Sequence, residues 1–298
     1  MIGGMIVSWT VFYAVSKAVV DLTGSALLSG ALIRLGALLF LTIQIAASGK
    51  FRLLFKQGRT TWILVLIGVF GFLLDLFANL GYRYGSLGTG TALLKTDVLM
   101  VNLASVVIYR KKLRLIDWIA TALMLFGVFL VLEIDVRDLS FRFTDLFFLL
   151  SALAVSVNAF IIRYVQKKRN VDADVISYYN NFVVLLLFSI SAGVTGDFSR
   201  FSLRAFEWWF LPLVALGGLA QTGIYFFYYR NLKRFEVWQV KLYLLLMPVL
   251  SAVAGVLFFG EKPGVWKTIG IFVVLFGASI VVLSSRKQKL SQKEQVSE

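Results

Sequence analysis

Six charged side chains lie inside long apolar stretches of the sequence, where they could bind a charged solute or carry a proton. They are Lys17, Arg34, Asp75, Lys95, Asp97 and Lys241. A charge at the centre of a membrane-spanning helix costs about 2.5–3.5 kcal/mol, so it needs a partner or a function. The chain has no histidine and no cysteine. Proton transfer would therefore depend on carboxylates, and disulfides and the usual zinc sites are excluded.

Lys95 is the strongest single candidate for a binding residue, because it continues a polar stripe on one helical face. The stripe runs from Thr91 through Lys95 to Asn102 at helical spacing. Lys241 can either snorkel to the membrane surface or face the same cavity. Two lysines that face one cavity would suit a carboxylate or another anion.

The intramembrane carboxylates have two alternative roles, proton coupling and structural ion pairing. Asp97 stands about 200° around the helix from Lys95, so it should face a neighbouring helix and pair with Arg34 or Lys17. Asp75 is a candidate proton carrier, because burial raises the pKa of a carboxyl group. Arg34 lies in the middle of its apolar stretch and needs a partner, whereas Lys17 also fits an interfacial position near a helix end.

Polar and aromatic stripes on several apolar segments could line the cavity. One such face joins Trp9 and Tyr13, and another joins Gln221 and Tyr225. Aromatic walls with a few polar groups suit small organic solutes, although membrane packing and interfacial aromatic belts produce similar stripes. The substrate-binding residues predicted from these patterns are Tyr13, Asn158, Lys95, Gln221, Tyr225 and Lys241.

The elements that must position these residues are long apolar segments. Apolar residues make up 59% of the chain, charged residues make up 15%, and the mean hydropathy is +0.84. A soluble domain would have about 25% charged residues. The predicted spans are residues 2–20, 25–48, 60–82, 88–109, 115–133, 144–163, 174–195, 208–229, 236–259 and 265–285. A segment in lipid must satisfy its own backbone hydrogen bonds, so these ten spans should be helices.

The net charge of +14 comes mainly from basic residues in the loops between the predicted spans, and it does not indicate a nucleic-acid partner. Loops on one side and the C-terminal tail hold 19 basic residues, and loops on the other side hold seven. Basic residues collect in cytoplasmic loops, so both termini should be cytoplasmic. We expect the lipid bilayer and a small-molecule substrate as partners, and no nucleic acid.

Weak internal repeats divide the chain into two halves. Leu125-Phe126-Gly127 returns as Leu275-Phe276-Gly277 at a spacing of 150, and Lys95 returns as Lys241 at a spacing of 146. These matches predict five-helix repeats at residues 1–135 and 136–285, followed by a disordered cytoplasmic tail at residues 286–298. An odd number of helices per repeat inverts the second repeat relative to the first, which is typical of secondary transporters.

The second half carries the motif residues Phe259-Gly260-Glu261-Lys262, Trp266, Gly270 and Leu275-Phe276-Gly277. With the ten-helix plan they resemble the drug/metabolite transporter superfamily, EamA type. In the first half Arg110-Lys111 stands where Gly-Glu is usual. The resemblance implies an all-α membrane fold of two inverted five-helix repeats in a bacterial plasma membrane. It also implies secondary active transport of an amino-acid-like or organic-anion metabolite by alternating access.

Other interpretations remain open at this stage. Tyr178-Tyr179-Asn180-Asn181 is similar to the F-Y-N-N motif of the nucleotide-sugar branch, which would make the protein a nucleotide-sugar or organic-phosphate antiporter. A membrane receptor or scaffold is the alternative outside transport. The residues show no catalytic constellation, and we expect no enzyme activity, no cofactor and no metal. The protein could be a monomer or a homodimer.

Overall fold

The structure is a computed structural model. It describes residues 1–84, 93–108, 110, 113–132, 143, 145–200, 208–250, 253, 262 and 264–297. Within these ranges the side chains of residues 17, 82–84, 200, 282 and 284–297 are not described. Some residues named in the sequence analysis lie outside the described parts, namely Thr91, Lys111, Phe259, Gly260 and Glu261. The side chain of Lys17 is also not described.

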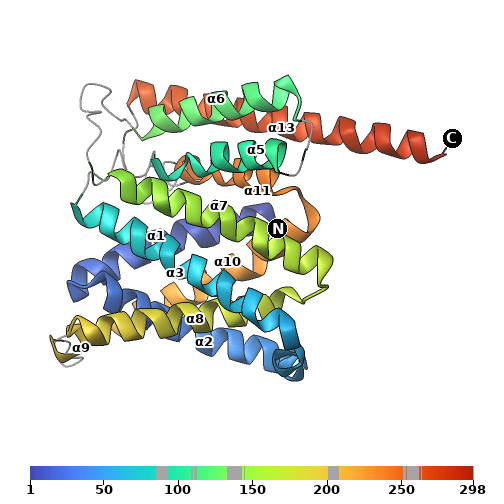
Figure 1. Cartoon of the computed structure of the whole chain (residues 1–298). Coiled ribbons are helices and arrows are strands. Elements are labelled where there is room, and N and C mark those ends of the chain that lie inside the picture. Colours follow the sequence, from blue (N-terminus) through green and yellow to red (C-terminus); the bar gives the residue numbers. More distant parts are fainter. Residues whose placement is uncertain are drawn as a thin grey trace.

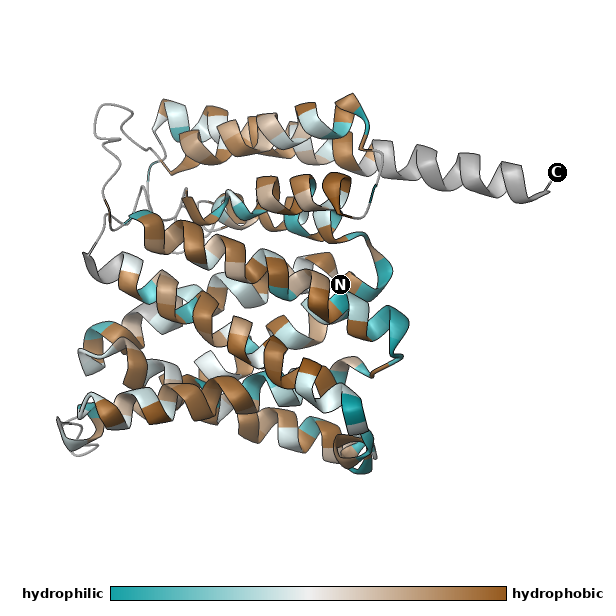
Figure 2. Ribbon diagram, viewed as in Figure 1, coloured by the Kyte–Doolittle hydropathy of each residue, from teal (hydrophilic) through white to brown (hydrophobic). Residues whose placement is uncertain are grey.

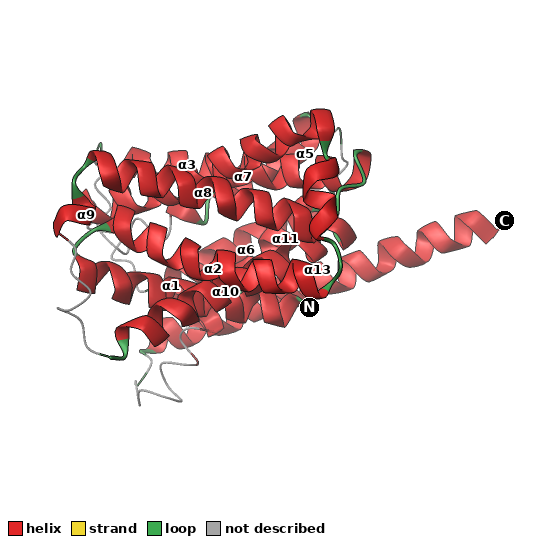
Figure 3. Ribbon diagram, turned by 90° about the horizontal axis from the view of Figure 1, so that it is seen from below, coloured by secondary structure: helices red, strands yellow, loops and turns green. Residues whose placement is uncertain are grey.

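The described chain is built from helices, and none of its described residues forms a strand (Figures 1 and 3). The long helices are α1 (Ile2–Thr23), α2 (Ala26–Ala47), α3 (Thr61–Tyr84), α5 (Asp97–Val107), α6 (Leu115–Val131), α7 (Asp145–Lys168), α8 (Ala173–Val194), α10 (Phe210–Arg234), α11 (Val237–Leu244) and α13 (Val265–Ser297). The short ones are η1 (Phe51–Lys56), η2 (Gly58–Thr60) and α9 (Asp197–Arg200). Each long helix falls on one predicted span.

The lengths and surface of these helices fit a membrane. Six of them are long and apolar enough to cross one, and four shorter apolar helices correspond to the fourth, fifth, ninth and tenth spans. Large apolar side chains such as Leu39, Phe126 and Phe272 are exposed. Apolar residues recur along the long helices (Figure 2). The all-α integral-membrane fold predicted from the sequence is confirmed.

The two halves pack against each other as an inverted pair. Helix α1 packs on α10 and α3 packs on α7, while α2 pairs with α8, α5 with α11, and α6 with α13 (Figure 1). When each span is exchanged for its equivalent in the other half, with α5 in the fourth span and α11 in the ninth, the first pair becomes the second and the last three pairs are unchanged. The packing is therefore symmetric between the halves, as expected for two inverted five-helix repeats.

The clearest equivalence is between α2 and α8, and local sequence explains it. Both helices are 22 residues long, and they begin 147 residues apart. Each begins at an N-cap side chain, Ser25 or Asp172, that accepts a hydrogen bond from a backbone amide of the first turn. Each is followed by a left-handed glycine, Gly49 with φ 66° or Gly196 with φ 73°.

The fourth and ninth spans are both broken. Pro248 predicts a kink in the ninth span, whereas the fourth span was expected to be a continuous helix. Lys95 and Thr96 form a turn before α5, and residues 245–246 form one after α11. In the second case Pro248 explains the break, because proline has no backbone N–H to continue the ladder. In the first case Thr96 Oγ1 donates to the Leu93 carbonyl at 2.6 Å, which competes with the helical pattern.

These breaks correct one predicted equivalence. The two breaks lie 150 residues apart. This is also the spacing of Leu125-Phe126-Gly127 and Leu275-Phe276-Gly277, which we call the LFG repeats. This register pairs Lys95 with Leu245, so the prediction that Lys95 and Lys241 are equivalent across the halves is wrong. The polar stripe through Lys95 also assumed an unbroken helix at this point.

The LFG repeats mark a reciprocal backbone contact between α6 and α13. A Cβ on Gly127 would lie 2.7 Å from Val274 and 3.0 Å from the Gly270 carbonyl. A Cβ on Gly277 would lie 2.5 Å from Met124, the residue equivalent to Val274. The glycines recur because each lets the two helices approach closely at the same place.

The C-terminal segment differs from its prediction. Helix α13 continues to Ser297, whereas the sequence predicted a disordered tail at residues 286–298. The segment from Arg286 onward contains no glycine or proline, and Lys, Gln and Glu are good helix formers. The preceding span can therefore extend without a stop signal.

The crossing of α2 and α10 tests the importance of close backbone packing. A Cβ on Gly218 would lie 2.6 Å from the Ala37 amide nitrogen, so Gly218→Ala should destabilise the protein by about 1–3 kcal/mol. Thermal unfolding in detergent measures this as a lower melting temperature. The matched variant Gly193→Ala meets no atom within 4 Å and should leave the melting temperature unchanged or raise it. Equal effects of both variants would contradict the observed crossing.

Candidate functional site

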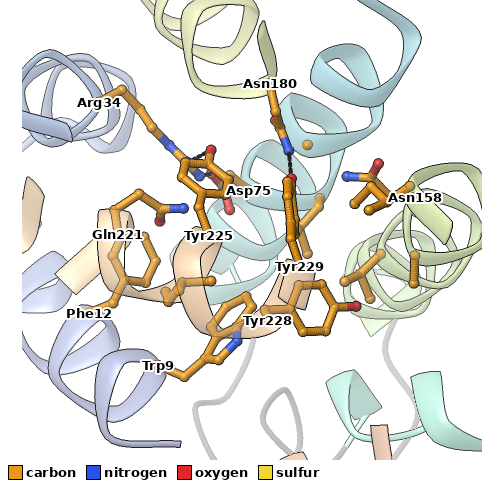
Figure 4. Close-up of a pocket in the computed structure, with 16 residues that line it drawn as sticks. Trp9, Phe12, Arg34, Asp75, Asn158, Asn180, Gln221, Tyr225, Tyr228 and Tyr229 are labelled. Atoms are coloured by element: carbon orange, nitrogen blue, oxygen red, sulfur yellow. Dashed lines mark hydrogen bonds and ion pairs between the residues drawn. The ribbon is translucent and has the colours of Figure 1, made fainter. Parts of the chain in front are cut away.

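A cavity lies between six helices, three from each half (Figure 4). The space between its lining atoms is about 470 Å³, including space open to the outside. Helices α1, α2 and α3 line one part, and α7, α8 and α10 line the other. The polar and aromatic lining residues are Trp9, Phe12, Arg34, Asp75, Asn158, Asn180, Gln221, Tyr225, Tyr228 and Tyr229.

Arg34 and Asp75 are the two charged residues in the described lining, and they pair with each other. Arg34 Nη2 donates to Asp75 Oδ2, and Nη1 donates to the Tyr225 hydroxyl (Figure 4). The guanidinium carbon also lies 5.9 Å from the Phe12 ring centroid and 5.8 Å from that of Tyr225. The Arg34 side chain is 6% exposed and that of Asp75 is 21% exposed, so the carboxylate reaches farther into open space.

Asn180 and Tyr229 hold the second part of the lining in place. Asn180 Nδ2 donates to the Tyr229 hydroxyl, which joins α8 to α10 (Figure 4). A Cβ on Gly71 would lie 2.6 Å from Asn180 Oδ1, so only glycine lets α3 approach this side chain. The neighbouring Asn181 donates to the Arg34 carbonyl at 2.9 Å and joins α8 to α2.

Four buried polar atoms of the lining have no hydrogen-bond partner within the described residues. They are Trp9 Nε1, Asn158 Oδ1, Asn180 Oδ1 and the Tyr228 hydroxyl. An unpaired buried polar group costs about 1–3 kcal/mol, so a bound solute or water that satisfied these atoms would be stabilised. The lining residues therefore offer one donor, two acceptors and a hydroxyl in addition to the charged pair.

The structure brings together half of the predicted substrate-binding residues. Asn158, Gln221 and Tyr225 line the cavity, whereas Tyr13, Lys95 and Lys241 do not. Tyr13 is 39% exposed on the outer side of α1. Helix α1 instead presents Trp9 and Phe12, which are three residues apart and lie on the same face.

Lys241 does not line this cavity and is held in a structural ion pair next to its wall. Its Nζ donates to Asp97 Oδ2 at 2.8 Å and lies 5.7 Å from the Tyr228 ring centroid. Asp97 thus pairs with Lys241 and not with Arg34, because α5 and α11 pack against each other. Lys95 Nζ lies 3.9 Å from Met247 Sδ and makes no ion pair within the described residues.

A second charged group, which we name the basic-end cluster, lies at one end of the bundle. It consists of Gln44, Lys50, Asp172, Asp174 and Arg230. Lys50 Nζ donates to Asp172 Oδ2 and Asp174 Oδ2, both at 2.8 Å. Arg230 Nη2 donates to Asp174 Oδ1 at 3.0 Å, and Gln44 Nε2 donates to the same oxygen at 2.9 Å. The cluster joins α2 and its following loop to α8 and α10.

The cluster keeps its charges near neutral pH. Hydrogen bonds to Asp172 and then Asp174 raise the pKa of Lys50. Burial acts to raise the pKa of Asp172, but the hydrogen bond from Lys50, the backbone bond and the nearby cations together lower it. The ion pair is therefore fully charged between the ordinary values of the two groups.

The sequence matches one known family over both halves, at residues 1–133 and 142–283. The chain belongs to the EamA-like transporter family. This membership confirms the resemblance seen in the sequence motifs, and it makes the protein a multi-pass member of a membrane transporter family. The boundary at residues 135 and 136 stays a prediction.

A solved structure supports the fold of this EamA-like protein. A protein described only as "Crystal structure of protein" superposes with a TM-score of 0.72 at 16% identity. The match covers 95% of this chain and 99% of that chain, and at this identity it shows the fold alone. Comparison with curated proteins gives no match. Within the described ranges, no three carboxylates form a group that could hold a metal.

Asp97 and Lys241 should stabilise the fold only when both charges are present. Lys241→Met leaves Asp97 buried without its ion-pair partner and should cost about 3–5 kcal/mol of stability. The double variant Lys241→Met with Asp97→Leu removes both charges and should recover most of the loss. Thermal unfolding of the single and double variants measures this coupling. Additive losses would show that the two side chains do not stabilise each other.

The basic-end cluster predicts a plateau in the pH dependence of stability. The stabilisation from Asp172 is present above its ordinary pKa of 3.8 and is lost as the pH falls through its lowered value. That from Lys50 is present below 10.5 and is lost as the pH rises through its raised value. The melting temperature of wild type minus that of Lys50→Gln should therefore stay constant from about pH 6 to 9. A steady slope across this range would contradict the pairing.

Proposed function

We propose that the protein is a secondary active transporter that moves a small polar or amphipathic metabolite through this cavity by alternating access. The observation that carries the proposal is the Arg34–Asp75 pair in an aromatic-walled space between the two inverted halves. Each half contributes three helices to the walls. Rocking one half against the other would therefore change which side of the membrane reaches the cavity.

The lining favours a substrate that carries a carboxylate beside an apolar group. A guanidinium binds carboxylates through paired hydrogen bonds, and Asp75 can bind an ammonium group. Trp9, Phe12 and Tyr228 supply apolar surface. An amino-acid-like zwitterion uses both charges, and a simple organic anion uses Arg34 alone. Because Asp75 already occupies Arg34, an incoming carboxylate must share or displace it.

The nucleotide-sugar alternative receives no specific support from the site. Its resemblance rested on the segment from Tyr178 to Asn181. Asn180 is bonded to Tyr229 and Asn181 to the Arg34 carbonyl, so both amides hold helices together. Tyr179 donates to the Leu54 carbonyl at 2.7 Å and does not line the cavity.

The proposed orientation places the basic end of the bundle in the cytoplasm. This end carries Lys50, Arg230 and the loops around them, and Met1 lies there beside Asn231 and Arg234. The C-terminal end of α13 lies on the same side as the N-terminus in Figure 1. Positively charged loops favour the cytoplasmic side, which supports cytoplasmic termini.

A binding screen of the purified protein tests the site. Amino acids, organic anions, nucleotide sugars and organic cations are added in turn, and the melting temperature is recorded. A ligand that binds only the folded protein raises the melting temperature by mass action. We expect a carboxylate compound to do so, and Arg34→Gln should weaken its binding about tenfold or more, because a hydrogen bond to a charged group is lost.

Lys95→Gln is the matched control, because it removes an intramembrane cation that does not line the cavity. Binding that survives Lys95→Gln and fails in Arg34→Gln supports the Arg34 site. The reverse pattern would place the anion site at Lys95. Uptake of the bound compound into proteoliposomes then tests transport, and a ligand that binds but never crosses would contradict the proposed function.

A further inference from the structure

The equivalence of α2 and α8 places two corresponding contacts at opposite ends of this helix pair. Ser25 and Asp172 are the equivalent N-caps, 147 residues apart. Lys50 and Asp197 directly follow the equivalent left-handed glycines at the other ends of the two helices. At each end the N-cap of one helix bonds to the residue beyond the end of the other, Asp172 to Lys50 and Ser25 to Asp197.

The contact at the basic end is ionic and is centred on a buried carboxylate. The Asp174 side chain is 4% exposed and accepts hydrogen bonds from both Lys50 and Arg230. A charge-assisted hydrogen bond is roughly twice as strong as a neutral one, and removing one partner leaves a buried charge unpaired. Opening this end requires the separation of α8 from both α2 and α10.

At the opposite end a hydroxyl, and no cation of the described residues, binds the carboxylate. Ser25 Oγ donates to Asp197 Oδ2 at 2.5 Å. The residue equivalent to Asp174 is Leu27, which packs in a small apolar cluster with Phe72 and Phe188. Among the described residues, the end opposite the basic end therefore has one hydrogen bond between these elements, whereas the basic end has three ion pairs.

The ionic contact lies on the two helices, α8 and α10, that also form part of the cavity wall. Asp174 lies six residues before Asn180 on α8, about 9 Å along the helix. Arg230 directly follows Tyr229 on α10. Because Asn180 also bonds to Tyr229, α8 and α10 are held together both in the cavity wall and beneath it.

We propose that these two contacts are the paired gates of the transport cycle, and that their unequal strength keeps the basic end closed at rest. The inference rests on the proposed transport function. In the empty protein, the ionic gate holds the basic end shut while the Ser25–Asp197 gate opens more readily. The cavity is then reached first from the end opposite the basic end.

Directional labelling of a single cysteine tests the proposal. The natural chain has no cysteine, so a reporter introduced at a lining position, Val155→Cys, is the one thiol present. Vesicles of known orientation are treated with a membrane-impermeant maleimide on either side. We expect the reporter without other changes to react faster from the end opposite the basic end.

Two matched Asp→Asn variants distinguish the gates. Asp174→Asn should raise the labelling rate from the basic end about fivefold or more, the size of a typical coupling between two states. Asp197→Asn should not raise that rate. Equal effects of the two variants, or an unchanged rate in Asp174→Asn, would overturn the inequality of the gates.

Two further measurements keep the test decisive if Asp174→Asn fails to fold. Arg230→Gln removes one cation of the basic-end cluster and should also raise labelling from the basic end. Raising the salt concentration should do the same without any substitution in the cluster, because Lys50 and Asp172 are 32% and 34% exposed and are screened by ions. If neither Arg230→Gln nor a higher salt concentration changes the labelling rate from the basic end, an ionic gate is excluded.

A variant that strengthens the Ser25–Asp197 contact should have the opposite effect, a slower labelling rate. Ser25→Lys places a cation beside Asp197 and should slow labelling from the end opposite the basic end. Labelling needs no substrate and no transport. A protein that labels as expected but moves no solute would therefore overturn the proposed function and leave the gates standing.

Discussion

A guanidinium inside a membrane has to be surrounded by acceptors, and much of this bundle is arranged around that requirement. Arg34 reaches Asp75 on α3 and the Tyr225 hydroxyl on α10, while its own backbone carbonyl accepts from Asn181 on α8. One residue of α2 thus sets the relative positions of three other helices. The cavity exists where these helices cannot close completely around the pair.

The same constraint explains the second charged group in the membrane. Lys241 and Asp97 meet where α5 and α11 pack together, next to the breaks in the fourth and ninth spans. A broken helix leaves backbone groups unpaired at membrane depth, which is tolerated only inside protein or beside a polar space. The pairing of the broken spans with each other keeps both breaks within the bundle.

The sequence was sufficient to predict the spans, the inverted repeat and the family. Each of these depends on composition, periodicity or short motifs, which are properties of the chain itself. The directions in which side chains face could not be predicted equally well. Tyr13 and Trp9 shared one predicted stripe, but α1 is rotated so that Trp9 and Phe12 face the cavity. A difference of one residue in a helical face changes which side chains reach a binding site.

The errors in the charged residues have a similar origin. The spacing of Lys95 and Asp97 was interpreted on an ideal helix, whereas Lys95 lies in a turn before α5 begins. The partner of Asp97 is 144 residues away, and only the packing of α5 on α11 brings it close. A single sequence contains Pro248, which signals one break, but it contains no comparable signal for the break at Lys95 and Thr96.

The reciprocal glycine contact between α6 and α13 also limits how the two halves can change during evolution. Gly127 fits against Gly270 and Val274 of the other half, and Gly277 fits against Met124. A larger side chain in one half can be accommodated only by a change in the other. Both halves match the same family model, but this contact makes them dependent on each other. A chimera that combined one half with the corresponding half of a distant relative would have to preserve both surfaces of this contact in order to assemble.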